Sequence, residues 1–192
     1  MKHLSSIAAE KDFSSLIKAL ASEVIGSKEP DARISDCVDC SSSTLKESEL
    51  CGGGIPTYGA SGISGYTADA MCESDSILIT KDGSGVGAMR YVHGAHSFVG
   101  TLCSLTAKAR IYLPYIYYAL MDMNFDAYKT GQAIPHIYFK DYGKESIYCP
   151  DYEEQIRLAK VMELIDAKSG HEKALLQSLQ SAKAYLLAEL FI

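Results

Sequence analysis

The chain has 192 residues, of which 47% are hydrophobic and 22% are charged, and its formal net charge at pH 7 is −6. This composition is typical of a globular protein, and the chain is long enough to bury one good core, so we expect one compact domain with an appendage. No run of about 18 or more apolar residues occurs, which excludes a transmembrane helix. The N-terminal residues 1–13 carry charges where a signal peptide needs an apolar stretch. We therefore expect a cytoplasmic protein with no membrane partner.

The charge is unevenly distributed along the chain. Between residues 77 and 148, seven Lys and Arg residues stand against five Asp and Glu residues, which gives +2 and leaves −8 for the remainder. Three of the five histidines also lie in this stretch. The asymmetry is compatible with nucleic-acid binding, but ordinary solvated surface charge explains it equally well.

Residues 3–25 have the pattern of an amphipathic helix. Its apolar residues recur at helical spacing and form one face, made by Phe13, Leu16, Ile17, Leu20 and Val24. Gly26 stands where a helix C-cap favours glycine, and Pro30 follows shortly after it. We expect this helix to pair either with the C-terminal helix of the chain or with a partner protein.

The central region, residues 31–150, alternates short apolar runs with clusters of Gly, Ser, Asn and Asp. Residues 76–80 predict a buried strand, and residues 97–102 predict a second one. Residues 111–123 are apolar on nearly all sides and predict a buried helix, with Pro114 in its first turn. Residues 134–139 and 145–148 predict short extended segments.

The six cysteines give little sign of a metal site. Cys37 and Cys40 form a C-x-x-C pair, which is half of a typical zinc site, but the sequence has no second pair. We therefore expect no metal. The cysteines are predicted to be free thiols that pack as small apolar side chains.

From residue 151 onward the sequence predicts a long helix. Asp151 is a favourable N-cap, and Glu154 three residues later completes a capping-box pattern. The apolar residues then follow a heptad, but Ser169, Gly170 and Glu172 interrupt it. Because glycine costs about 1 kcal/mol against alanine in a helix, we expect two helical halves with a weak point near Gly170. Unbroken, the helix would reach roughly 58 Å at 1.5 Å a residue, so it needs either a partner helix or a fold back onto its own domain.

The glycine-rich stretch from Gly83 to Ala88 matches the pattern G-x-G-x-x-A of dinucleotide-binding turns. No acidic residue follows at the distance needed to bind a ribose, and the chain lacks repeated βαβ units. A tight glycine turn that brings the backbone close to a ligand such as a phosphate fits better. A small nucleotide-binding enzyme remains the alternative from a different functional class.

No other motif supports catalysis by this chain. The sequence contains no phosphate-binding P-loop and no Pro-Pro-aromatic loop of an amino-methyltransferase. His93 and His96 form an H-x-x-H pair, but no third metal ligand stands at a suitable spacing. We therefore predict no catalytic residue and no bound cofactor in this chain.

Five blocks in a fixed order carry a family resemblance. They are IPTYGASGISGY at 55–66, SILITKDGSGVG at 76–87, LPYIYYAL at 113–120, TGQAIPHIYFKDY at 130–142 and IYCPDYEEQIRLAKVMELID at 147–166. In this order they resemble one target recognition domain of the specificity (S) subunit of a Type I restriction-modification system, followed by its helical region. The resemblance covers about residues 31–192. S subunits usually carry two such units, so this chain resembles a half subunit.

The resemblance implies an α+β fold: a target recognition domain with a small twisted sheet and helices, followed by a long coiled-coil-type helix. It divides the chain into an N-terminal helix (1–30), a DNA-reading domain (31–150) and a helical spacer and dimerisation region (151–192). The domain would contact bases in the major groove of double-stranded DNA, while Lys and Arg hold phosphates. The candidate DNA-binding residues are Tyr58, Ser61, Lys81, Ser84, Arg90, Lys129, Thr130, Gln132 and His136. Of these, Gln132 suits a bidentate contact to adenine.

The resemblance also implies partners. Two identical chains would form a homodimer that binds a symmetric, interrupted DNA site. The expected dimer and partner interface is Leu158, Met162, Ile165, Leu176, Leu179, Leu186 and Leu190. Methyltransferase subunits would dock on the helices and bring S-adenosylmethionine, and a restriction subunit is a further expected partner. A silent recognition cassette and a fragment of a longer gene remain open as alternatives.

Overall fold

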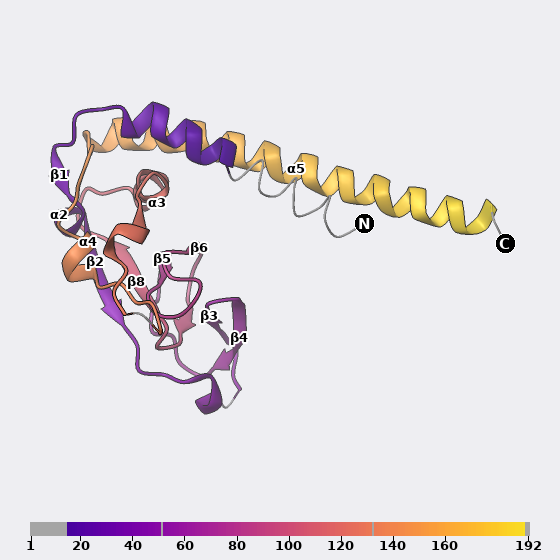
Figure 1. Cartoon of the computed structure of the whole chain (residues 1–192), viewed down its shortest axis with the longest axis horizontal. Coiled ribbons are helices and arrows are strands. Elements are labelled where there is room, and N and C mark those ends of the chain that lie inside the picture. Colours follow the sequence, from indigo (N-terminus) through magenta and orange to yellow (C-terminus); the bar gives the residue numbers. More distant parts are fainter. Residues whose placement is uncertain (1–14, 51, 132, 191–192) are drawn as a thin grey trace.

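The computed structural model describes residues 15–50, 52–131 and 133–190, with the side chains of residues 169, 170, 173, 189 and 190 left out. Gln132 and Phe13, two residues singled out above, lie outside the described residues. Figure 1 shows a globular part from which one long helix projects. Within the described residues, no helix combines the length and the apolar character that crossing a bilayer requires.

The globular part is built from short elements in the order that an α+β fold requires. A helical segment at residues 15–21 continues into the π-helical turn η1. The elements are η1 (Ser22–Gly26), β1 (Ala32–Arg33), α2 (Ile34–Cys37), β2 (Val38–Ser42), η2 (Glu47–Glu49), β3 (Ile55–Gly59), β4 (Gly62–Thr67), β5 (Ser76–Thr80), β6 (Met89–Val92), β7 (Ser97–Phe98), β8 (Leu102–Ala107), α3 (Leu113–Met121), η3 (Phe125–Tyr128), α4 (Phe139–Tyr142), β9 (Ser146–Ile147) and α5 (Tyr152–Leu190). The predicted fold class is confirmed.

The strands of the described residues form three small sheets. The largest has the strand order β2-β8-β5-β6 and is antiparallel throughout. The second has the order β4-β3-β7, in which β3 and β4 form an antiparallel hairpin and β3 runs parallel to β7. The third pairs β1 with β9 and so holds the start of the domain against its end.

Strand β5 lies inside the main sheet, and all five of its residues are buried. Ile77 and Ile79 face the main core together with the helices, while Leu78 faces a second, smaller core that includes Val92 and Phe98. Because both faces of the strand are covered, an unbroken apolar run is the expected sequence for it. The prediction of a buried strand at residues 76–80 is confirmed.

The helices form a layer over one face of the main sheet. Helix α3 contacts β5 below it and both η1 and α5 above it, and the segment leading into η1 lies beside the start of α5 in Figure 1. Ile17 and Ala21 of the N-terminal helix share one core with Ile116 of α3 and Met162 of α5. The described part of the N-terminal helix therefore packs on the C-terminal helix of its own chain, which is one of the two placements expected for it.

Helix α5 runs without interruption over 39 residues. The prediction of a weak point that divides it near Gly170 is therefore wrong, because one glycine costs too little to break a helix with strong residues on both sides. Its start follows the predicted cap: the backbone N–H of Glu154 donates to Asp151 Oδ1 at 3.0 Å. The Glu154 carboxylate accepts a hydrogen bond from Arg157 Nε at 2.6 Å, so it forms an ion pair with a residue three positions farther along the helix.

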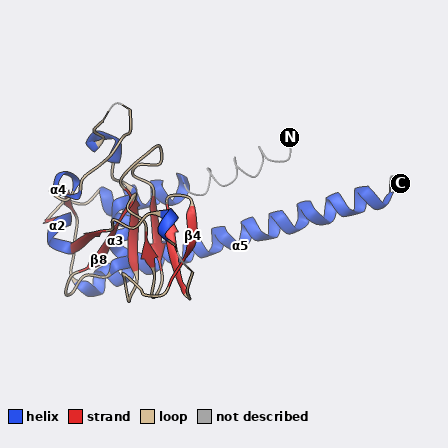
Figure 2. Ribbon diagram, turned by 90° about the horizontal axis from the view of Figure 1, so that it is seen from below, coloured by secondary structure: helices blue, strands red, loops and turns tan. Residues whose placement is uncertain are grey.

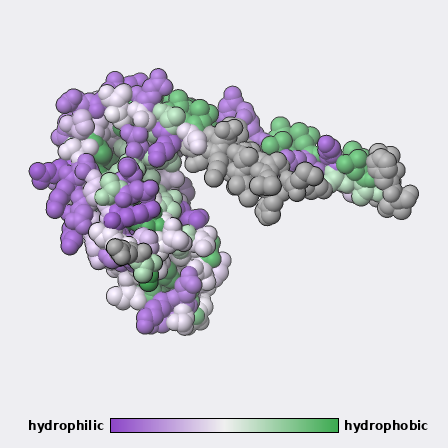
Figure 3. All heavy atoms as spheres, viewed as in Figure 1, coloured by the Kyte–Doolittle hydropathy of each residue, from purple (hydrophilic) through white to green (hydrophobic). Residues whose placement is uncertain are grey.

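The two halves of α5 have different surroundings. Leu158 and Met162 lie in the chain's own core, and Ile165 packs at its edge. Farther along, Leu176, Leu179 and Leu186 are 44%, 59% and 57% exposed. Figure 2 shows this outer half extending well beyond the strands, and Figure 3 shows hydrophobic residues, in green, along it. The prediction that Leu158 and Met162 belong to a partner interface is therefore corrected, because the N-terminal helix and α3 already cover them.

Two predicted extended segments differ from the structure. Residues 97–102 contain the whole of the two-residue strand β7 and the first residue of β8, with a turn between them that is closed by the Leu102 N–H donating to the Val99 carbonyl at 3.0 Å. Residues 134–139 are not one strand, because Phe139 begins α4 and His136 makes only isolated bridges. The predictions for residues 111–123 and 145–148 are confirmed as α3 and β9, each shorter than expected.

Candidate functional site

The glycine-rich turn between β5 and β6 is the first part of the candidate site. Gly83 and Gly87 have φ angles of +96° and +89°, which residues with side chains rarely adopt. The turn closes through the Gly87 N–H, which donates to the Thr80 carbonyl at 2.9 Å. Ser84, at its tip, is exposed, and Lys81 is half-buried. The backbone of this turn is therefore held in one shape while Ser84 stays accessible.

A second loop, residues 129–137, packs directly against this turn. The Gly83 N–H donates to the Pro135 carbonyl at 2.9 Å, and the Ile137 N–H donates to the Lys81 carbonyl at 2.9 Å. The loop itself closes through Thr130 and His136, whose backbones exchange two hydrogen bonds of 2.9 Å. The structure thus brings together five of the predicted DNA-binding residues, from parts of the chain about fifty residues apart: Lys81, Ser84, Lys129, Thr130 and His136.

The side chains of the second loop are only partly free. Lys129 Nζ lies 2.6 Å from Asp126 Oδ1, so its charge is already paired within the chain. The His136 ring stands edge-on to Tyr138, with 4.8 Å between ring centroids, and Lys140 Nζ lies 5.0 Å from the centre of the Tyr138 ring. Tyr138 and Lys140 were not among the predicted site residues. Both are exposed, Tyr138 contacts His136 and Lys140 contacts Tyr138, so we add them as further candidates.

The β3–β4 hairpin and β6 form the second part of the site. Arg90, an exposed residue of β6, places its guanidinium carbon 5.9 Å from the centre of the Tyr58 ring on β3. Ser61 is exposed in the turn that joins β3 to β4. Tyr58, Ser61 and Arg90 therefore belong to one region, although β3 and β6 lie in different sheets.

Residues 97–101 connect the two parts. The Val99 N–H donates to the Tyr58 carbonyl at 2.9 Å, and the Lys81 N–H donates to the Thr101 carbonyl at 2.9 Å. One short segment thus binds the Tyr58 region at one end and the glycine turn at the other. Eight of the nine predicted residues lie in two neighbouring groups, one made of loops and one of the β3–β4 hairpin with β6, and the ninth, Gln132, lies outside the described residues.

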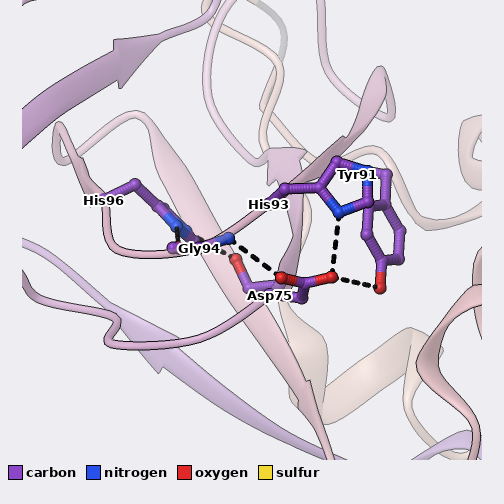
Figure 4. Close-up of polar contacts among 6 residues, drawn as sticks. Asp75, Tyr91, His93, Gly94 and His96 are labelled. Carbon is purple, nitrogen blue, oxygen red and sulfur yellow. Dashed lines mark hydrogen bonds and ion pairs between the residues drawn. The ribbon is translucent and has the colours of Figure 1, made fainter.

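A carboxylate that the sequence did not reveal holds the connection between β6 and β7. Asp75 accepts hydrogen bonds from Tyr91 Oη at 3.0 Å and from the Gly94 N–H at 2.9 Å, and its Oδ2 lies 2.9 Å from His93 Nδ1 (Figure 4). Burial acts to raise the pKa of Asp75, but the contacts with Gly94, His93 and Tyr91 outweigh it and lower that pKa. An acidic residue directly before a buried strand was the only available signal.

The neighbouring histidine and the C-x-x-C pair are engaged within the fold. His96 is fully buried, with Nε2 at 2.7 Å from Ser76 Oγ and Nδ1 at 2.7 Å from the Gly94 carbonyl. Cys37 Sγ lies 3.6 Å from Cys149 Sγ, and this contact raises the pKa of Cys37. Among the described residues, no three His, Cys, Asp or Glu side chains are arranged to hold a metal ion.

The geometry of the glycine turn disfavours the nucleotide-binding alternative. A dinucleotide fingerprint needs a strand, the turn, and then a helix whose N-terminus faces the pyrophosphate. Here residues 83–88 join two antiparallel neighbours, β5 and β6, so a strand follows the turn. The element that would bind the pyrophosphate is not at this position.

Comparison with known proteins gives a consistent family. The family described as the Type I restriction modification DNA specificity domain matches residues 33–181. A type I specificity subunit of Mycoplasma genitalium is 31% identical over 152 residues, which cover 76% of this chain and 39% of that protein. The chain therefore spans well under half the length of this relative.

Solved structures share the fold. The S subunit of a Type I restriction-modification system from M. genitalium has a TM-score of 0.67 at 22% identity, over 97% of this chain and 54% of that one. A structure on complex assembly and conformational transition of the type I R-M system has a TM-score of 0.73 at 18% identity, and the match covers 96% of this chain and 52% of that one. The HsdS subunit from Thermoanaerobacter tengcongensis has a TM-score of 0.62 at 19% identity, and the match covers 94% of this chain and 51% of that one. In each case this chain matches about half of the other.

Proposed function

Because the chain belongs to the family of Type I restriction-modification DNA specificity domains, we propose that it is a sequence-specific DNA-binding specificity subunit in half-subunit form. It binds double-stranded DNA and directs a partner methyltransferase to a two-part site. The observation that carries this proposal is the family match over residues 33–181, which includes both the globular domain and most of α5.

The candidate site supports DNA contact by its shape and its residues. The loop at residues 81–88 and the loop formed by residues 129–131 and 133–137 meet through backbone hydrogen bonds, and they carry the exposed Ser84 and Thr130 and the half-buried His136. Arg90 provides an exposed cation beside Tyr58 of the β3–β4 hairpin. Loops fixed by a rigid sheet are suited to placing side chains at base edges, while cations bind the phosphates. The net negative charge of the chain does not oppose this, because binding depends on the local field.

The long helix supplies the remaining parts of the proposal. Its exposed leucines suit contact with a second copy of the same chain. This chain matches about half of each solved relative, and a second copy would take the place of the other half. Two domains related by a two-fold axis would bind two identical half-sites with inverted orientation. Methyltransferase subunits, and a restriction subunit in the full assembly, would dock on the same helices. S-adenosylmethionine and all catalytic residues belong to those partners, and the assembly acts in the cytoplasm, where the DNA is.

The test is a methyl-transfer assay with purified components. The chain is mixed with the modification subunit encoded beside it, radiolabelled S-adenosylmethionine and a library of DNA duplexes. Transfer that requires both proteins and selects a subset of duplexes supports the proposal. Transfer by the modification subunit alone, or no complex between the two proteins, contradicts it and leaves a silent cassette or a fragment as the explanation. A nucleotide-binding enzyme would instead show tight dinucleotide binding by the isolated chain.

A further inference from the structure

The exposed half of α5 carries two charged residues in the middle of its apolar stripe. Heptad positions along this stripe hold Leu176, Leu179 and Leu186, but also Glu172 and Lys183. All five side chains are exposed. Within the part of the chain that the structure describes, Glu172 and Lys183 form no ion pair. About 16 Å of helix separates them, so they do not reach each other within one chain.

The two charges distinguish the possible pairings of this helix with a second copy. In a parallel pair, each residue faces its own equivalent, so Glu172 meets Glu172 and Lys183 meets Lys183. Both contacts would be repulsive at the centre of the interface. In an antiparallel pair, residues from opposite ends of the stripe face each other, and opposite charges can meet.

We propose that Glu172 of one copy pairs with Lys183 of the other in an antiparallel dimer, and that these two crossed ion pairs fix the register of the helices. The proposal rests on the half-subunit function above. In this register Leu176 of each copy faces Leu179 of the other, so the pairing is apolar at its centre and charged on both sides. The two-fold axis passes between Gln177 and Ser178.

Neighbouring registers are worse by the same criterion. A shift of one heptad toward the globular domain places Glu172 against Leu176 and Lys183 against Ile165. A shift in the other direction places Lys183 against Leu179. Each shift leaves charges facing apolar side chains, which costs desolvation without a compensating contact. Polar residues at such interior positions are a known means of fixing register and orientation in coiled coils.

The register has a geometric consequence for the assembly. The axis lies about 26 residues beyond the start of α5 at Tyr152, which is roughly 38 Å along the helix. The two α5 starts, and the globular domains attached to them, therefore lie on opposite sides of the axis. A one-heptad slip would change their separation by roughly 10 Å, so the ion pairs set how far apart the two DNA-reading domains are held.

Charge reversal tests the register in the full-length chain. Glu172→Lys and Lys183→Glu are made singly and together, and dimer dissociation is measured by sedimentation equilibrium. Each single change turns two attractive contacts into repulsive ones, so Kd should rise roughly tenfold or more, and the double change should restore it. Lys160→Glu, an exposed residue outside the overlap, is the matched control and should leave Kd unchanged. Circular dichroism verifies that every variant keeps its helix content.

The outcomes separate the register from the proposed function. A dimeric wild type whose single variants are unaffected, or whose double variant stays weak, overturns the register but leaves the half-subunit function standing. A monomeric wild type overturns both. A carbodiimide that joins carboxylates to lysines gives a second reading on the unmodified protein. A linked Glu172–Lys183 peptide between isotopically distinct copies supports the register, and links only between other residues overturn it.

Discussion

Arg90 of β6 and Tyr58 of β3 contact each other across two separate sheets, with 5.9 Å between the guanidinium carbon and the centre of the ring. The same arginine is within 3.9 Å of the position that a Cβ on Gly62 would take, at the start of β4. A cation stacked over an aromatic face is held in place at low entropic cost. The contact therefore links the β3–β4 hairpin to the main sheet and holds one positive charge at the candidate DNA surface.

This contact gives the first prediction. Arg90→Ala should raise the Kd for duplex DNA about 3- to 10-fold, nearly independently of sequence, and should reduce the salt slope by about one unit. Arg90→Lys keeps the charge and should recover part of the affinity. Lys160→Ala on α5 is the control. Fluorescence anisotropy titrations at several salt concentrations measure both quantities, and an unchanged salt slope in Arg90→Ala would remove this residue from the interface.

Two glycines of the turn provide a matched pair for stability. Gly83 and Gly87 both have positive φ, but a Cβ on Gly83 would meet no atom within 4 Å, whereas one on Gly87 would lie 2.7 Å from Phe125 Cβ. Gly83→Ala should therefore cost about 1–2 kcal/mol of folding stability from backbone strain alone. Gly87→Ala should cost more, because Phe125 must also move. Urea unfolding curves decide this, and equal losses would show that the Phe125 contact relaxes freely.

The Asp75 cluster predicts a specific dependence of stability on pH. Its hydrogen bonds lower the pKa of Asp75 in the folded chain, so they stabilise the fold fully above the ordinary value of 3.8 and lose that effect as pH falls through the folded pKa. Asp75→Asn should lower stability by about 1–2 kcal/mol at neutral pH. Its deficit against the wild type should shrink as the pH falls below 3.8. Thermal melts between about pH 5 and pH 2 measure the deficit, and a deficit that does not shrink over this range would contradict the assignment.

The two halves of α5 should respond differently to the same kind of change. Met162 is fully buried in the core, so Met162→Ala should cost about 2–5 kcal/mol of folding stability. Leu179 is 59% exposed, so Leu179→Glu should leave the stability of the globular domain within about 0.5 kcal/mol but abolish self-association. Denaturation curves give the folding stability of both variants, and sedimentation gives the self-association of both. Loss of stability without loss of dimer in Leu179→Glu would reverse the assignment.

The parts of the fold that were correctly predicted have local causes. The strand at residues 76–80, the proline at the start of α3 and the Asp151 cap of α5 each depend on neighbours within a few residues. The candidate site residues could be assigned to one site only because five sequence blocks occur in the order typical of the family. The strand alternation and glycine positions alone would not have joined the loop at 81–88 to the loop at 129–137.

The failures have a physical explanation as well. Met162 and Leu179 stand in one heptad, and periodicity shows that both need an apolar neighbour but not which helix provides it. Only the tertiary structure shows that α3 and the N-terminal helix cover the first and leave the second exposed. Likewise, Asp75 contacts a backbone N–H 19 residues away, and no local pattern indicates such a contact.

The most direct test of the half-subunit account is the pattern of methylated bases in cells that carry this gene and its modification subunit. Single-molecule sequencing of genomic DNA is compared before and after deletion of the gene. The account predicts that deletion removes one methylated motif, made of two identical half-sites in inverted orientation with a spacer of constant length. A methylation pattern that survives the deletion, or a lost motif with two different halves, would contradict it.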